Sequence, residues 1–274
     1  MTQYHDSNQN SSRNVGWCWK ANGGTTSSNT DGSVTTTVQA NTTAGFSIVL
    51  YTGTGANATF GHGLGAVPKM IITKTRSNSG DWMVYHGANT SAPQTDFLKL
   101  NATNLTEDLN TVFNDTAPTS SVFSLGSNGD VNTSGRTQVA YVFAEVEGYS
   151  KFGSYDANGN DDGTFVFLGF RPAFFMLKNT SNNTNGGNWV IMDDTRLGDD
   201  VGAIPPILSH LKANSSDAEF DAANYPMADF LANGFKLRLG GTNSGLARNV
   251  NNANGNDYIY MAFAHSPFKF ANAF

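Results

Sequence analysis

Short apolar runs, bounded by prolines, glycines and polar turns, recur along the whole chain. Met70–Ile72 and Phe174–Leu177 each begin two residues after a proline. In Trp82–Val84 and Trp189–Ile191, a tryptophan and a β-branched residue stand two positions apart. This step of two keeps both side chains on one face of a pleated strand. The pattern predicts strands joined by many turns rather than long helices.

The same succession of segments occurs twice, and in the same order. We predict an all-β chain of two tandem, diverged β-sandwich-like units with short helical insertions. The predicted units are residues 45–147 and 148–274. The matched segments are Gly45–Tyr51 with Gly148–Tyr155, Leu64–Lys74 with Leu168–Lys178, Gly80–Tyr85 with Gly187–Met192, and Val139–Ala144 with Ile259–Ala264.

A third copy of the closing segment stands near the start, at Val15–Ala21. No unit precedes it, so we predict an orphan strand that completes a sheet in its own or a neighbouring chain. Residues 1–14 are polar and are predicted to be a flexible arm, with 15–44 as orphan strand and linker. Trp17, Cys18 and Trp19 are the predicted assembly or anchoring residues, with Cys18 as a small buried thiol.

The second unit carries an insertion from about Gly198 to Asp229. Ala203–Leu211 and Asp217–Ala223 are its two stretches with a helical pattern, so short surface helices or turns are expected there. Phe230–Leu239 then predicts a hairpin with Asn233-Gly234 as its turn. Its expected counterpart in the first unit is Val122–Gly126.

Composition narrows the classes of partner. Charged residues are only 14% of the chain and the net charge is −6. Because no run of Lys or Arg is present, a nucleic-acid partner is not expected. Net acidity weakens attachment to anionic membranes, and no apolar run approaches the about 20 residues that cross a bilayer, so no membrane insertion is expected either. Residues 1–14 lack the pattern of a secretory signal.

One loop has the spacing of a metal site. Asp156, Asn158, Asn160 and Asp162 place oxygen atoms at alternating positions, as calcium loops do. The sixth and twelfth positions are Asp161 and Phe167 instead of Gly and Glu, which favours a solvated hairpin loop. Calcium is therefore an alternative here, and no other cofactor is expected.

The sequence offers no catalytic constellation. It contains no nucleophile elbow, phosphate loop or zinc pattern. His62 lies between two glycines and is interpreted as a structural turn residue, while His86, His210 and His265 lack counterparts in the other unit. We predict that the chain is not an enzyme.

Three segments resemble a known family. Gly61–Ile72 resembles a segment that recurs in phage tail-fibre and other virion-associated proteins, and Gly169–Phe174 and Tyr258–Ala264 resemble other parts of the same repeats. In that family the unit is an uncharacterised β-sandwich-like domain, often found after a lectin-like domain in long fibres. The resemblance covers residues 15–274.

This resemblance implies a structural bacteriophage virion protein, made in the bacterial host cytoplasm and carried on the particle. The first expectation is a tail-fibre or tail-associated module that contacts the host surface. The alternatives are a capsid decoration or head-fibre protein, and a polysaccharide-binding or depolymerising tailspike domain. The implied partners are other virion proteins, further copies of the chain (a trimer first) and a host surface glycan or protein.

Overall fold

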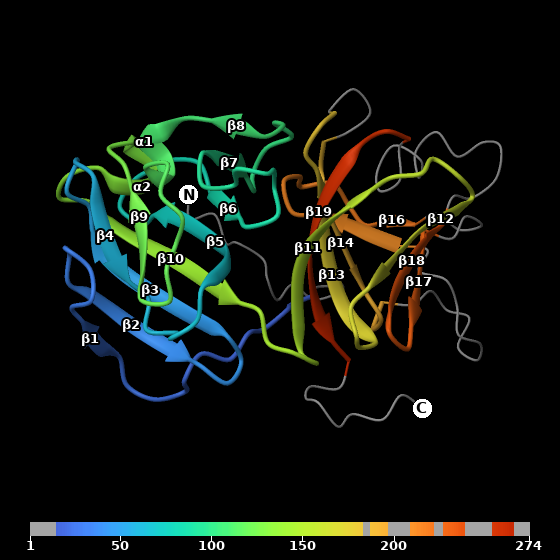
Figure 1. The fold of residues 1–274 in the computed structure, drawn as a ribbon, viewed down its shortest axis with the longest axis horizontal. Helices are drawn as coiled ribbons and strands as arrows, with labels where there is room; N and C mark the ends of the chain where they lie inside the picture. The colour runs from blue at the N-terminus through green and yellow to red at the C-terminus, as the bar shows by residue number, and fades with distance from the viewer. Residues whose placement is uncertain (1–14, 183–186, 197–208, 222–226, 239–253, 266–274) are drawn as a thin grey trace, which may run out of the picture.

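The computed structural model describes residues 15–182, 187–196, 209–221, 227–238 and 254–265, and these are almost entirely β (Figure 1). The predicted fold class is confirmed: two sandwich-like units lie side by side, each built from antiparallel sheets. Helix in this part of the chain is limited to two single turns, α1 (Asn110–Phe113) and α2 (Gly129–Asn132).

The first unit has an eight-stranded sheet and a small second layer. Phe60 and Phe123 of the second layer pack against Tyr51 of the large sheet, and α1 and α2 add Phe113 and Val131 to the same core. The large sheet runs in the order β1 (Ser27–Asn29), β2 (Thr36–Asn41), β3 (Phe46–Thr52), β10 (Thr137–Ala144), β5 (Pro68–Thr75), β6 (Met83–His86), β7 (Asp96–Lys99), β8 (Glu107–Asp108); the second layer is β4 (Ala58–Gly61) and β9 (Val122–Leu125).

The second unit repeats this plan. Phe230 and Phe235 of its small sheet pack against Phe175 of the large one, around a separate core. The large sheet runs β11 (Ser150–Asp156), β19 (Asp257–Ala264), β13 (Pro172–Asn179), β14 (Trp189–Asp193), β15 (Ser209–Lys212), β16 (Phe220–Asp221); the small sheet runs β12 (Asp162–Phe167), β18 (Gly234–Arg238), β17 (Ala228–Leu231).

The order of strands shows the duplication directly. From β3 to β8 the first sheet follows the same path as the second sheet from β11 to β16, with the closing strand inserted second in both. Both closing strands shift register at the same place, where Ala144 pairs with Pro68 and Ala264 with Pro172. Proline has no N–H to give to a ladder, so an irregularity beside it costs little.

The register corrects our alignment of the two opening segments by one residue. Ala144 N–H donates to Gly45 O, and Ala264 N–H donates to Tyr149 O, each at 2.8 Å. Gly45 is therefore equivalent to Tyr149 rather than to Gly148, and Tyr51 is equivalent to Tyr155. A slip of one residue exchanges the two faces of a strand, and the corrected pairing places both tyrosines in their sandwich cores.

Some predicted elements differ. Ser209–Lys212 and Phe220–Asp221 are strands where helical stretches were expected, and the remainder of Ala203–Leu211 and Asp217–Ala223 lies partly outside the described residues. The Asn233-Gly234 hairpin is confirmed as β17 and β18, and β9 pairs with β4 as β18 pairs with β12. The two described helices lie in the first unit, not in the insertion.

The expected orphan strand is also corrected. Val15–Ala21 forms no strand and joins no ladder, and β1 and β2 from the expected linker belong to the first sheet.

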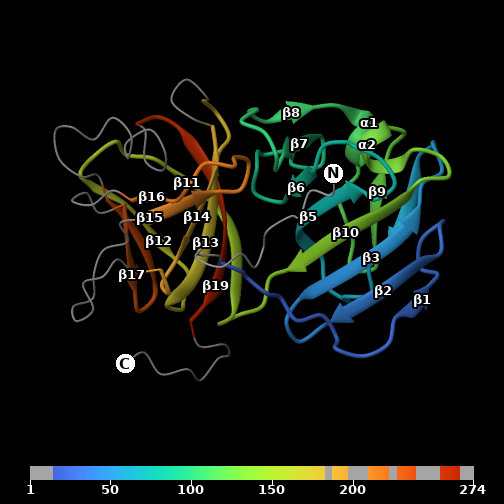
Figure 2. The ribbon, with the colours of Figure 1, turned by 180° about the vertical axis from the view of Figure 1, so that it is seen from behind.

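The N-terminal segment packs against a third apolar core instead of joining a sheet. This core lies between the two large sheets and is built by both units, with the N-terminal segment crossing at the junction (Figure 2). The buried members of this core include Ala21, Phe46, Met70, Val84, Phe143, Phe152, Phe174, Trp189, Met261 and Phe263.

Candidate functional site

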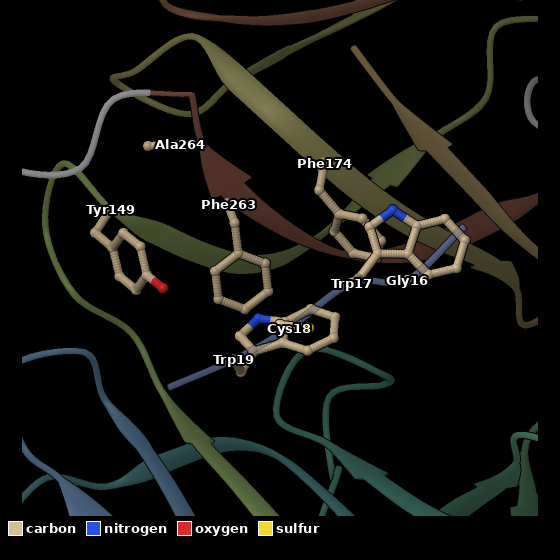
Figure 3. Close-up of a pocket in the computed structure, with 8 residues that line it drawn as sticks. All are labelled: Gly16, Trp17, Cys18, Trp19, Tyr149, Phe174, Phe263 and Ala264. Carbon is tan, nitrogen blue, oxygen red and sulfur yellow. The ribbon is translucent and has the colours of Figure 1, made fainter. Parts of the chain in front are cut away.

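The junction between the two units is built around the aromatic segment at residues 16–19 (Figure 3). The Trp19 ring lies edge-on to three phenylalanines, with ring centroids 6.1 Å from Phe143, 5.5 Å from Phe174 and 5.4 Å from Phe263. Trp17 packs edge-on against Phe174 at 5.7 Å. The segment therefore contacts the closing strands of both units at once. Edge-to-face pairs of this kind add about 1 kcal/mol each to the free energy of area burial.

Polar contacts fix the segment in place. Trp17 Nε1–H donates to Asp193 Oδ2 at 3.3 Å, and the Arg196 guanidinium lies 5.6 Å from the Trp17 ring. The backbone that follows the segment is held from β2, because Asn41 Nδ2 donates to Lys20 O at 3.1 Å and Gln39 Nε2 donates to Gly24 O at 2.8 Å. Side-chain anchoring thus replaces the strand ladder that the sequence predicted.

Cys18 differs from the two neighbouring tryptophans in its exposure to solvent. It is exposed, so the expectation of a buried thiol is wrong. The order Trp17-Cys18-Trp19 does not by itself tell which side chains the rest of the protein covers, because the segment joins no sheet. The assembly role assigned to these three residues remains a prediction.

A cavity of about 530 Å³ lies beside the segment, between the two large sheets. Its walls are apolar, with aromatic and aliphatic side chains in similar number, and Trp82 and Tyr141 stack with ring centroids 6.3 Å apart on one side of it. Its lining residues are Trp17, Cys18, Trp19, Phe46, Ile48, Ile72, Trp82, Leu100, Tyr141, Phe143, Phe174, Met176, Ile191, Ala213 and Met261.

His86 joins the units through a buried hydrogen bond. Ala88 N–H donates to its Nδ1 at 3.2 Å, so Nε2 carries the proton and donates to Tyr260 O, 3.0 Å away in the other unit. Burial lowers the pKa of His86 to about 4, against the opposing effect of the Tyr260 carbonyl. The ring is therefore neutral at pH 7 and acts as a structural donor.

The duplication gives His86 an unexpected counterpart. His86 pairs with Met70 across the ladder, and Asp193 pairs with Phe174, the residue equivalent to Met70. One ancestral position thus became a histidine that binds the facing unit and an aspartate that binds Trp17 and Arg196. The repeat in the sequence gave no sign of this role, because the residue equivalent to His86 in the second unit is not a histidine.

Two equivalent lysines bind backbone carbonyls, and one of them adds a further contact across the junction. Lys74 Nζ donates to Gly80 O at 2.6 Å, and the equivalent Lys178 bonds the equivalent Gly187 O. Lys178 is fully buried and also reaches Thr103 O of the first unit at 3.3 Å, and burial lowers its pKa to about 8. Scattered lysines of this kind are otherwise expected to be solvated at strand ends. Their repetition with a glycine at the same spacing was the available signal.

The calcium candidate is folded as a polar hairpin loop. Asn158 Oδ1 accepts the N–H of Asn160 at 3.0 Å, and Asn158 Nδ2 donates to Asp162 O at 3.1 Å. Asp162 pairs with Lys236 at 2.7 Å and Arg238 at 3.2 Å, and the Lys236 contact above all holds its pKa below the usual range. No group of three or more acidic, His or Cys side chains is placed to hold a metal in the described part of the chain. Calcium binding at Asp156–Asp162 stays a prediction.

His62 is held inside the first unit by backbone groups. Its Nε2 lies 3.2 Å from Thr119 O, and its Nδ1 accepts from Leu64 N–H at 3.2 Å. Burial lowers its pKa. Both ring nitrogens are thus used to shape the turn.

Within the described ranges, no helix is both long and apolar enough to span a membrane.

Comparison with known proteins gives a family and no activity. Residues 1–267 match the model of a family described as "Domain of unknown function (DUF7483)". No curated protein matches the chain, and no solved structure does. The junction is accordingly interpreted from its own geometry.

Proposed function

For this member of the DUF7483 family, a domain of unknown function, we propose a role as a non-catalytic structural component of a bacteriophage particle. In this proposal it forms a tail-fibre or tail-associated module that assembles with further copies of itself and contacts the host surface. The resemblance of Gly61–Ile72 to virion-associated repeats supports a place for the protein on a phage particle. The rest of the support comes from the junction.

The observation that carries the proposal is the shared core between the two units. Each sandwich buries its own core, and the two together bury a third one, with Trp17 and Trp19 packed against it. The buried polar groups at this junction bind backbone carbonyls: His86 binds Tyr260 O and Trp189 Nε1 binds Lys99 O at 2.8 Å. Such a body suits a rigid building block, whereas an enzyme would present convergent reactive groups in a cleft.

Quantitative mass spectrometry and antibody labelling of purified particles test this proposal. We expect the protein in gradient-banded particles at a fixed copy number, with antibody on the tail seen by electron microscopy. Its absence from banded particles would overturn the virion role. Label on the head would replace the tail assignment by the alternative, a capsid decoration or head-fibre protein.

Adsorption experiments test the host contact. We expect purified protein to bind host cells and to slow phage adsorption in a concentration-dependent way, through a surface glycan or protein. Incubation with host polysaccharide, followed by sizing of the product, separates this binding role from the depolymerising tailspike alternative. Shortened polysaccharide would contradict the non-catalytic assignment.

A further inference from the structure

The duplicated units differ at one side of the sandwich, between the opening strand and the small sheet. In the first unit the chain closes this side itself with residues 27–41. Here β2 pairs with β3, and Val34 N–H donates to Thr59 O of β4 at 3.1 Å. Thr36 Oγ1 donates to Gly61 O at 2.8 Å. A side chain at Gly61 would collide with Asn29, so glycine permits this close cover.

The second unit has the same side without the cover. Only five residues, 145–149, connect β10 to β11, too few for a counterpart of β1 and β2. As a result β11 is an edge strand of the large sheet and β12 an edge strand of the small one, among the strands that the structure describes. Edge strands offer unpaired N–H and C=O groups to another chain.

The positions that are covered in the first unit carry exposed phenylalanines in the second. Phe60 pairs with Phe123 as Val166 pairs with Phe235, and Phe123 and Phe235 each lie 6.4 Å from the tyrosine of their own unit. Thr59 is therefore equivalent to Phe165, and Gly61 to Phe167. Phe165 is 42% exposed and Phe167 is 57% exposed. Two aromatic rings at alternate positions of one edge strand form a patch, unlike single exposed apolar residues.

We propose that β12 is a self-association surface, on which a second copy of this chain docks its own β12 in antiparallel sense. Antiparallel pairing of a strand with its own copy obeys a two-fold axis, so one patch serves both partners. The named strand pairs of the molecule are all antiparallel, and this pairing continues the β17–β18–β12 sheet in the same sense.

Charge complementarity supports the second copy as the occupant. Asp161, just before β12, is exposed, and Asp162 beside it is already paired with Lys236 and Arg238; at the other end of the strand the Lys151 ammonium lies 5.4 Å from the Phe167 ring. Antiparallel pairing centred on Phe165 brings Asp161 of one copy towards the Lys151 end of the other. Parallel pairing would set like charges together.

Sedimentation velocity of the full chain tests the pairing. We expect a dimer whose dissociation constant rises at least about tenfold in the Phe165→Ser/Phe167→Ser variant. Both side chains are exposed, so its circular dichroism and melting temperature should stay those of the wild type. Leu109→Ser is the matched control, because Leu109 is similarly exposed at 44% in the first unit and should leave the dimer intact.

A cross-linking variant makes the test independent of affinity. In a Cys18→Ser background, Phe165→Cys should give a disulfide-linked dimer under mild oxidation, since paired residues across a two-fold ladder lie within disulfide reach. Leu109→Cys in the same background should stay monomeric on a non-reducing gel. A monomeric or trimeric wild type, a dimer that survives the double substitution, or equal cross-linking of both cysteine variants would overturn the proposal.

Discussion

At the residue scale, the duplication separates what each position does for its own sandwich from what it does for the junction. Lys74 and Lys178 make the same bond to an equivalent glycine, but Lys178 alone is fully buried and crosses to Thr103. His86 and Asp193 stand at one equivalent position with different partners. At these two pairs of positions, divergence after duplication changed the contacts between the two units.

The lysine pair gives a matched substitution experiment. Lys178→Ala leaves the buried Gly187 carbonyl and the Thr103 carbonyl without this donor and opens a cavity, so the free energy of unfolding should fall by about 3 kcal/mol. Lys74→Ala removes the equivalent bond at a half-buried site and should cost about 1 kcal/mol. Chemical denaturation of both variants measures the difference, and equal losses would contradict the junction role of Lys178.

The buried histidine predicts a loss of stability in acid. Because the pKa of His86 is about 4 in the folded chain and about 6.5 unfolded, the unfolded state binds more protons between these values. Stability is complete above pH 6.5 and falls as the pH drops towards 4, by up to about 3 kcal/mol from this residue. Burial lowers the pKa of His210 to about 4 as well, so it adds to the same window.

His86→Gln checks this assignment. At pH 7 it should be less stable than the wild type, because the Tyr260 bond is altered. Its melting temperature should then change less between pH 6.5 and 4. An unchanged slope across that window would show that His86 is not the titrating group.

At the element scale, a segment without a ladder takes the place that a strand was expected to fill. Val15–Ala21 resembles the closing strands in composition, yet both closing strands are already central in complete sheets. Its two tryptophans are half-buried and pack against the core between the sheets instead. The alternation of large residues therefore indicated a packed segment, and the strand ladder expected for it was wrong.

Removing the two tryptophans tests what this segment contributes. Trp17→Ala/Trp19→Ala should lower the free energy of unfolding by about 4 kcal/mol, since it removes the edge-on contacts with Phe174, Phe263 and Phe143. Val15→Ala, at an exposed position of the same segment, should change it by less than about 0.5 kcal/mol. Urea unfolding monitored by far-UV circular dichroism makes the comparison, and similar values for both would contradict the packing role.

At the scale of the whole molecule, three cores hold two units together. The sandwich cores belong to one unit each, and the third belongs to both. Since residues such as Phe143 and Phe263 contact each other across the junction, at 6.2 Å between ring centroids, neither unit can expose its large sheet without disturbing the other.

This arrangement predicts cooperative unfolding. Scanning calorimetry of the wild type should show one transition, with equal calorimetric and van't Hoff enthalpies. Two separated transitions would mean that the units unfold independently and that the third core is weak. The Trp17→Ala/Trp19→Ala variant should broaden or split the transition, because it loosens this core and leaves both sandwich cores intact.

The sequence by itself determined the all-β class, the two units, their Pro-entered strands and the Asn233-Gly234 hairpin. These features depend on period-two patterning, turn chemistry and internal repetition, which are local or can be compared within the chain. The tertiary structure alone decided the register of the opening strands, the burial of Lys178 and His86, the exposure of Cys18 and the place of Trp17 and Trp19. Those outcomes depend on which sheet faces meet. An apolar strand face carries the same pattern whether it covers its own sandwich or the neighbouring unit.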